Sequence, residues 1–309
     1  MAQRVKLKAT GLEVFPLCLG GNVFGWTANQ EESFKVLDAF VEAGGNFIDT
    51  ADMYSEWAPG NSGGESESII GKWMKSRGNR HEVVIATKVA KLSKRPGLSA
   101  SNIDKALEDS LNRLQTDHID IYYAHEDDQN VELLETMTAF DRHVKSGKVH
   151  ILGASNYSGA RLREASKLCQ NHQLTQFKAL QNHYNLVERK DFESDSGIAA
   201  TELGMDSIPY FGLARGFLTG KYQPGKMVES ARAQGASAYF NDKGWAILNA
   251  VTEIAQNHSV SNAAVALAWL RAKQQTPIAS ARTTEQLKEL VQIVELNSDE
   301  IAKLDLVSN

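Results

Sequence analysis

The alternation of strand-like and helix-like stretches constrains the fold of this chain more than any other feature of its sequence. Short apolar runs typical of strands are followed by helix-like stretches, and this order repeats without a break in composition. We expect strands at residues 17–21, 46–50, 82–88, 118–125, 149–155, 177–182, 206–211 and 276–281. The helices expected after them cover residues 30–42, 65–75, 99–114, 131–144, 158–169, 196–203, 243–258 and 283–291, with a further helix at 261–272.

This order predicts both the fold class and the domain organisation. A repeated strand-then-helix pattern favours an α/β fold with a parallel sheet. Eight such units favour a closed (β/α)₈ TIM barrel over an open sheet, and they form a single domain over residues 1–309. Residues 5–15 alternate in polarity around Thr10-Gly11, which predicts an N-terminal β-hairpin that plugs one end of the barrel. The longest irregular stretch, 222–239, is either a lid or a disordered segment.

The composition narrows the classes of partner. The chain has 309 residues, is 42% hydrophobic and 23% charged, and carries a net charge of -5, as expected for a soluble globular protein. No basic block favours nucleic acid, and no run approaches the ~18 apolar residues of a membrane-spanning helix. The N-terminus lacks the apolar core of a signal peptide, so we expect a cytoplasmic protein. Cys18 and Cys169 are too far apart for a zinc signature, and we predict no metal site. The oligomeric state stays open.

Titratable side chains stand where several predicted strands end. Asp49 ends the second strand, Lys88 the third and His125 the fourth, and Tyr54 follows in the loop after Asp49. In a closed barrel these ends lie on one rim, which is where barrel enzymes keep their chemistry. We expect the Lys88 ammonium, held by Asp49, to lower the pKa of the Tyr54 phenol. His125 would donate a hydrogen bond to a substrate oxygen, so the set is suited to carbonyl reduction with a hydride-donating cofactor.

Each of these residues also has an ordinary structural interpretation. Asp49 is equally a helix cap or turn former, and Lys88 a surface lysine with a buried stem. His125 precedes three acidic residues, so a metal-dependent barrel hydrolase built on His125, Asp127 and Asp128 is an alternative. The four groups on neighbouring strand ends favour the proton-handling site over these alternatives.

A second pattern lies at the start of the last predicted helix, in residues 279–286. Thr283 and Gln286 have the spacing of a capping box, and a helix start attracts anions. Arg282 adds a permanent charge and Ser280 a hydroxyl, which predicts a phosphate site; the alternative is a capped helix with a surface arginine. No G-x-G-x-x-G follows any strand, so a dinucleotide would not be held in the Rossmann manner.

Further residues on the rim are suited to a bound aromatic ring and to substrate. Tyr210 would stack on a nicotinamide, or is a buried aromatic residue in a turn, and Gln181 and Asn156 would hydrogen-bond a carboxamide. Three aromatic residues after the first two strands form either an apolar substrate wall or ordinary rim packing: Phe24, Trp26 and Trp57.

Several stretches resemble the aldo-keto reductase family, in particular bacterial members related to potassium-channel β-subunits. They are FIDTADMY, IATKV, IYYAH, ILGASN, LQNHYN, LARGFLTGKY and PIASARTTEQL, in family order over residues 12–290. The resemblance implies an NADPH-dependent (β/α)₈ oxidoreductase with the catalytic tetrad Asp49, Tyr54, Lys88 and His125. It also implies cofactor contacts at Ser155, Asn156, Gln181, Tyr210, Leu213, Gly216, Leu218, Ser280, Arg282 and Gln286.

The chain departs from the family pattern in the loops expected to hold the cofactor. Glu289-Leu290 stands where the family commonly has Glu-Asn, which removes an amide from the adenine contacts. Arg282 favours NADP(H) over NAD(H). We therefore expect an enzyme that reduces small aldehydes or ketones to alcohols with Tyr54 as the proton donor. The alternative is an NADPH-binding regulatory or sensor subunit with incidental turnover.

Overall fold

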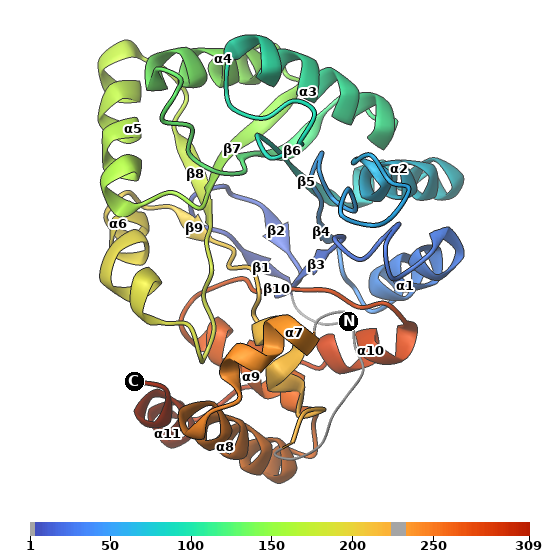
Figure 1. The fold of residues 1–309 in the computed structure, drawn as a ribbon, viewed down its shortest axis with the longest axis vertical. Helices are drawn as coiled ribbons and strands as arrows, with labels where there is room; N and C mark the ends of the chain where they lie inside the picture. The colour runs from blue at the N-terminus through green and yellow to red at the C-terminus, as the bar shows by residue number, and fades with distance from the viewer. Residues whose placement is uncertain (1–3, 224–232) are drawn as a thin grey trace.

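The sheet has the expected closed parallel arrangement. The structure, a computed structural model, describes residues 4–223 and 233–309. Within them, eight parallel strands follow the order β10-β3-β4-β5-β6-β7-β8-β9, curled into a (β/α)₈ barrel (Figure 1). The strands are β3 (Cys18–Gly20), β4 (Phe47–Asp49), β5 (Val84–Val89), β6 (Ile119–Ala124), β7 (Val149–Ser155), β8 (Phe177–Gln181), β9 (Asp206–Ser207) and β10 (Ile278–Ala279).

Backbone hydrogen bonds close the barrel between β9 and β10, the two ends of the strand order. The amide of Thr276 donates to the carbonyl oxygen of Ser207 at 3.0 Å, and the amide of Ile278 donates to that of Pro209 at 2.9 Å. Closure leaves no open edge on the sheet. Because all eight strands are parallel, their C-terminal ends lie on one rim.

Helices surround the strands on the outside of the barrel (Figure 1). Several begin at a serine whose hydroxyl oxygen accepts a backbone N–H of the first turn, as Ser99, Ser158 and Ser261 do. The helices are α1 (Gln30–Glu42), α2 (Glu65–Arg77), α3 (Ala100–Leu114), α4 (Leu133–Lys145), α5 (Gly159–His172), α6 (Gly197–Glu202), α7 (Ala233–Ala236), α8 (Asp242–His258), α9 (Asn262–Ala272), α10 (Thr284–Leu290) and α11 (Ser298–Ser308). Short helical turns are η1 (Arg80–Glu82), η2 (Phe192–Ser196), η3 (Ala214–Thr219) and η4 (Ser237–Tyr239).

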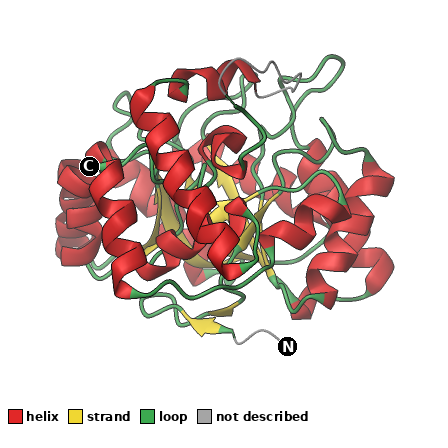
Figure 2. Ribbon diagram, turned by 90° about the horizontal axis from the view of Figure 1, so that it is seen from below, coloured by secondary structure: helices red, strands yellow, loops and turns green. Residues whose placement is uncertain are grey.

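The predicted N-terminal hairpin is confirmed. Strands β1 (Val5–Lys6) and β2 (Glu13–Val14) pair antiparallel, and the hairpin lies across one end of the barrel (Figure 2). The side chain of Asn46, just before β4, accepts from the amide of Phe15 at 2.8 Å and donates to the carbonyl oxygen of Glu13 at 3.0 Å. The hairpin is thus tied to the N-terminal end of the barrel, and the opposite end stays open.

Two groups of buried apolar side chains make up the core. The larger group fills the space between strands and helices, and the smaller group fills the barrel interior. The interior group includes Phe47, Ile121 and Tyr123 from the strands, and Leu7 and Val14 from the hairpin. Strands buried on both faces have near-continuous apolar sequences, which is why the strands were recognisable in this chain.

The structure differs from the expected elements mainly near the C-terminus. Strands β9 and β10 have two residues each. Strand β9 is short because, after it, Tyr210 keeps only an isolated bridge to His183. Helix α11 was not expected. Residues 224–232 of the irregular stretch lie outside the described residues, and residues 233–239 form α7 and η4. In the described part of the chain, no helix is both long and apolar enough to cross a membrane.

Candidate active site

A cavity of about 680 Å³ opens at the C-terminal rim of the barrel. It is lined by residues from β3, from the loops after β4 to β9, and from the start of α10. The residues predicted from the sequence that line it are Trp26, Asp49, Tyr54, Trp57, His125, Ser155, Asn156, Gln181, Tyr210, Leu213, Gly216, Ser280, Arg282 and Gln286.

A buried ion pair lies at the bottom of this cavity. The Nζ of Lys88 is 2.6 Å from Oδ2 of Asp49, and the two side chains are 0% and 2% exposed. The Lys88 ammonium also donates to the carbonyl oxygen of Thr50 at 2.7 Å and to Oη of Tyr54 at 2.9 Å. An ammonium has three N–H donors, and here each has an acceptor. Full pairing offsets the cost of burying the charge.

Tyr54 lines the cavity, as Asp49 does, and it carries the hydroxyl group of this cluster. Its hydroxyl accepts from Lys88 and lies 3.2 Å from Oδ2 of Asp49, to which it donates. The Lys88 Nζ is also 4.5 Å from the centre of the Tyr54 ring, a cation–π distance. The bond to Asp49 is long, so an oxygen atom entering the cavity can compete for the phenol proton.

The expected lowering of the Tyr54 pKa is wrong for this arrangement. Burial and the carboxylate of Asp49 raise the pKa of the phenol well above its ordinary value. Burial also lowers the pKa of the Lys88 ammonium, against the effect of Asp49. Loss of solvent and a nearby negative charge therefore outweigh the ammonium at Tyr54. The consequence is a neutral phenol at neutral pH, which can donate its proton.

His125 lies beside Tyr54 and is neutral. The two ring centres are 6.0 Å apart with 69° between the planes. Burial lowers the pKa of His125 well below its ordinary value, and the charges of Lys88 and Lys91 act in the same direction. Nδ1 is buried without a hydrogen-bond partner. An unpaired lone pair there costs less than an unpaired N–H would, which favours a proton on Nε2.

Polar side chains after β7 and β8 join the tetrad to the next part of the cavity. Gln181 donates from Nε2 to Oδ1 of Asp49 at 2.9 Å. Asn156 is in the left-handed region with φ of 57°, and it donates to the carbonyl oxygen of His125 and to Oγ of Ser155. Its Oδ1 accepts from the Tyr210 hydroxyl at 2.7 Å. These bonds fix the directions of the side chains on this side of the cavity.

Three of the residues predicted to bind an anion, Ser280, Arg282 and Gln286, line the cavity. Ser280 donates from Oγ to Oδ1 of Asn22 at 2.7 Å, and Thr283 caps α10 by accepting from the amide of Gln286. Gln286 bends back to accept from the amide of Arg282 at 3.0 Å, one residue before the position that a capping box requires. None of the ion pairs of the described residues involves Arg282, so its charge is available to a ligand.

The loop after β9 has a strained backbone along the cavity. Phe211, Ala214 and Arg215 have φ of 56°, 47° and 57°, values that non-glycine residues rarely adopt. Gly216 follows with φ of 90°. Such strain is concentrated at functional sites, where surrounding contacts maintain it. Arg215 lies over the Phe211 ring at 4.2 Å and lines the cavity, as does Lys221.

Comparison with known proteins decides the family. The model of the aldo/keto reductase family matches residues 16–309. The chain belongs to the aldo/keto reductase family. The oxidoreductase YrpG of Bacillus subtilis is 36% identical over 95% of this chain and 91% of its own length. The Tas protein of Escherichia coli is 30% identical over 98% of this chain and 96% of its own length. Norsolorinic acid reductase stcV of Emericella nidulans is 32% identical over 98% of this chain and 80% of its own length.

This aldo/keto reductase places three predicted site residues away from the cavity surface. Lys88 is fully buried and contacts the cavity through Tyr54. Phe24 and Leu218 are fully buried in the larger core group and do not line the cavity. The position of Phe24 favours the packing alternative. Trp26 and Trp57 do line the cavity, with ring centres 5.6 Å apart, edge to face.

The acidic residues after His125 have other partners in this reductase. Asp127 pairs with Arg161 at 2.8 Å, and Asp128 accepts the amide of Leu98 at 2.8 Å. The described residues therefore contain no three-ligand group at His125, and the hydrolase alternative has no structural support.

Sequence reasoning missed six polar residues that line the cavity: Asn22, Thr27, Lys91, Arg215, Thr219 and Lys221. Arg215 and Thr219 lie in η3 and the other four in loops, and none belongs to a periodic pattern. Their only signal was proximity to a strand end or to the glycine-rich stretch 212–220.

Proposed function

We propose that this aldo/keto reductase reduces aldehydes or ketones to alcohols with NADPH. The observation that carries the proposal is the bonding of Tyr54. Its hydroxyl lies at the cavity, bound to the ammonium of Lys88 at 2.9 Å and to the carboxylate of Asp49 at 3.2 Å. A protonated phenol beside a buried ammonium is suited to protonating an oxygen on which negative charge develops.

Tyr54 acts as the general acid in this proposal. When bound, the nicotinamide cofactor supplies a hydride to the carbonyl carbon. The π electrons of the C=O bond pass to the oxygen, and Tyr54 gives that oxygen its proton. The tyrosinate that remains is stabilised by the ammonium of Lys88, which already donates to Oη. The ammonium of Lys88 thus does not ionise Tyr54 before the reaction. It stabilises the tyrosinate that forms once the proton has been transferred.

His125 orients the substrate. A neutral imidazole with its proton on Nε2 donates one hydrogen bond to the carbonyl oxygen beside Tyr54. Two donors directed at one oxygen polarise the carbonyl and fix its position relative to the phenol. Trp26 and Trp57 provide an apolar wall for the rest of the substrate. This wall favours carbonyl compounds with an aromatic or aliphatic body over strongly polar ones.

The other residues of the cavity are suited to an extended dinucleotide. Tyr210 provides a flat ring, and Arg215, Lys221 and Arg282 provide cations along the same cavity. Gly20 lines the cavity, and a side chain there would clash with its neighbour, because a Cβ would lie 2.6 Å from Oγ of Ser280. In this proposal Ser155, Asn156 and Gln181 hold the carboxamide, while Leu213, Gly216 and Leu218 shape the loop along the phosphates. Ser280, Arg282 and Gln286 hold the adenosine end, with Glu289 and Leu290 beside them.

The NADPH preference depends on Arg282. An unpaired guanidinium at the adenosine end attracts a 2′-phosphate, which only NADP(H) carries. Leu290, which lines the cavity at the position where the family resemblance implies an amide, would supply an apolar contact, so we expect the adenine to be held less by polar contacts than by the arginine.

A steady-state assay with NADPH and a panel of aryl and aliphatic aldehydes tests the function. We expect Tyr54→Phe to lower kcat by about 10²–10⁴-fold, because it removes the acid, with little change in NADPH affinity. Trp73→Phe, which lies in the larger core group away from the cavity, is the matched control and should keep its kcat. Equal turnover by wild type and Tyr54→Phe would refute the role of Tyr54. Tight NADPH binding with no turnover on any carbonyl would favour a sensor subunit.

A further inference from the structure

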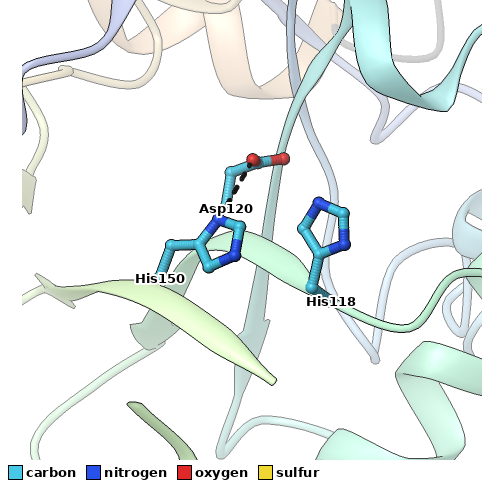
Figure 3. Close-up of side chains that lie close together, drawn as sticks. All are labelled: His118, Asp120 and His150. Carbon is cyan, nitrogen blue, oxygen red and sulfur yellow. Dashed lines mark ion pairs between the residues drawn. The ribbon is translucent and has the colours of Figure 1, made fainter. Parts of the chain in front are cut away.

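Two histidines and an aspartate gather at the end of the barrel opposite the active site. His118 directly precedes β6, Asp120 is the second residue of β6, and His150 is the second residue of β7. Figure 3 shows the three side chains grouped beside these two strands. Because Ile121 pairs with Ile151 in the ladder, Asp120 and His150 are neighbours across it and lie on the same face. His118 is two residues from Asp120 and shares that face.

The distances within this cluster are close to those of a metal site. One nitrogen of each imidazole and one oxygen of Asp120 lie within 4.8 Å of one another. Nδ1 of His150 is 3.6 Å from Oδ1 of Asp120. Zinc–ligand distances of 2.0–2.2 Å in tetrahedral geometry separate ligand atoms by roughly 3.3 Å. The cluster therefore needs a closure of about 1.5 Å at most.

The two imidazole rings provide this closure by turning. They are now stacked, with ring centres 4.7 Å apart and 25° between the planes, so their lone pairs do not converge. The side chains of His118 and His150 are 28% and 50% exposed, which leaves them room to rotate. A rotation about Cβ–Cγ directs one nitrogen of each ring toward the free oxygen of Asp120.

Neighbouring residues hold two of the three ligands, His118 and Asp120, in the way that hydrogen-bond partners orient the ligands of metal sites. Nδ1 of His118 is 2.6 Å from the carboxylate of Asp117, which leaves Nε2 as the free nitrogen. A carboxylate on the far nitrogen is the usual partner of a metal-bound histidine. Oδ2 of Asp120 is fixed by Arg80 at 2.8 Å and by the amide of Ile85 at 2.8 Å, which leaves Oδ1 for a metal.

We propose that His118, His150 and Asp120 form a binding site for a divalent transition metal ion, with zinc as the best fit. Two imidazoles and one carboxylate are a common zinc donor set, and a water molecule would complete the tetrahedron. Magnesium, which prefers six oxygen ligands, does not fit this set. The proposal departs from the expectation of no metal site, because ligand spacing along the sequence cannot reveal ligands that come from two neighbouring strands.

The bound ion would join the N-terminal ends of β6 and β7. An ion that binds the folded chain and not the unfolded one raises stability by mass action. The site lies at the end of the barrel away from the cavity, and none of its ligands lines the cavity. We therefore expect zinc to affect stability without being needed for turnover, so the site does not depend on the proposed function.

Equilibrium dialysis of the untagged full chain against ⁶⁵Zn²⁺, together with thermal unfolding, tests the proposal. We expect one zinc ion per chain at micromolar concentration and a higher Tm with Zn²⁺ than with Mg²⁺. His150→Ala and His118→Ala should each lose the bound ion and the Tm increase. His81→Ala, at a histidine 76% exposed outside the cluster, is the control and should retain both. Equal zinc binding by His150→Ala and wild type would overturn the proposal.

A second variant, which leaves both histidines in place, tests the proposal if a histidine variant folds poorly. Asp117 is 95% exposed, and within the described residues its bond to the cluster is to Nδ1 of His118. Asp117→Asn removes the charge behind the ligand, and we expect a 10–100-fold loss of zinc affinity. Full zinc affinity in Asp117→Glu would support the role of the Asp117 carboxylate in holding Nδ1 of His118. An unchanged affinity in Asp117→Asn would contradict the assignment of Nε2 as the ligand atom.

Discussion

Asp52 is a buried carboxyl group between Asp49 and Tyr54 to which the proposed chemistry gives no role. It is 1% exposed, and no side chain of the described residues donates a hydrogen bond to its oxygens. Burial, with the carboxylate of Glu67 nearby, raises the pKa of Asp52 to about 7. An unfolded chain returns the group to an ordinary pKa of about 3.9. The folded state therefore binds the proton more tightly than the unfolded state does.

The sign of the resulting pH dependence follows from this difference. Between about pH 4 and pH 7 the folded chain holds a proton on Asp52 that the unfolded chain has lost, so stability falls as pH rises. Asp52→Asn removes the ionisation. We expect it to raise the free energy of unfolding at pH 8 by on the order of 1–4 kcal/mol, and to change it little at pH 4. Urea unfolding at both pH values measures this. A gain at pH 4 equal to that at pH 8 would show that Asp52 does not titrate in the folded state.

At the scale of elements, the hairpin β1–β2 depends on a few buried hydrogen bonds. Asn46 is 3% exposed and bonds both an amide and a carbonyl oxygen of the hairpin strand. Asp206 accepts the amide of Thr10 at 2.8 Å from the other side. Both contacts lie at the end of the barrel opposite the cavity, so they hold the plug in place without contributing to the site.

Asn46→Ala should therefore weaken the fold and leave the chemistry intact. It leaves the amide of Phe15 without its acceptor, and we expect a loss of about 1–3 kcal/mol in the free energy of unfolding. Because Asn46 does not line the cavity, kcat at a temperature well below Tm should be unchanged. Chemical denaturation and the NADPH assay give the two numbers. A stability equal to that of wild type would mean that water replaces the lost hydrogen bonds.

At the scale of the whole molecule, the cavity is assembled from almost every strand of the barrel. Tyr210 after β9 and Arg282 after β10 both line it, next to the place where the barrel closes, and the proposed cofactor would contact both. Binding should therefore stabilise the whole closed barrel, because only the folded state offers the site. The gain is set by the ratio of ligand concentration to Kd, about 2.7 kcal/mol at 100 times Kd.

Thermal unfolding then reports cofactor preference without turnover. We expect NADPH to raise Tm more than NADH at equal concentration. Arg282→Leu should reduce the difference between the two by removing the partner of the 2′-phosphate. The control is Arg163→Leu, at a surface arginine paired with Glu202 outside the cavity. Equal Tm increases by both cofactors in wild type would contradict the NADPH preference, and an unchanged difference in Arg282→Leu would place the preference at another residue.

The sequence by itself determined the architecture and the positions of the tetrad. Strands buried on both faces leave apolar runs, so the repeat was visible without contacts, and Asp49, Lys88 and His125 followed from standing at strand ends. Only the tertiary structure decided the electrostatics. The direction of the pKa shift of Tyr54 depends on how deeply the phenol is buried and on how close Asp49 lies to it. Sequence spacing determines neither the burial nor the distance. The same holds for His118 and His150, which the barrel's register makes neighbours across a gap of 32 positions in the numbering (150 − 118).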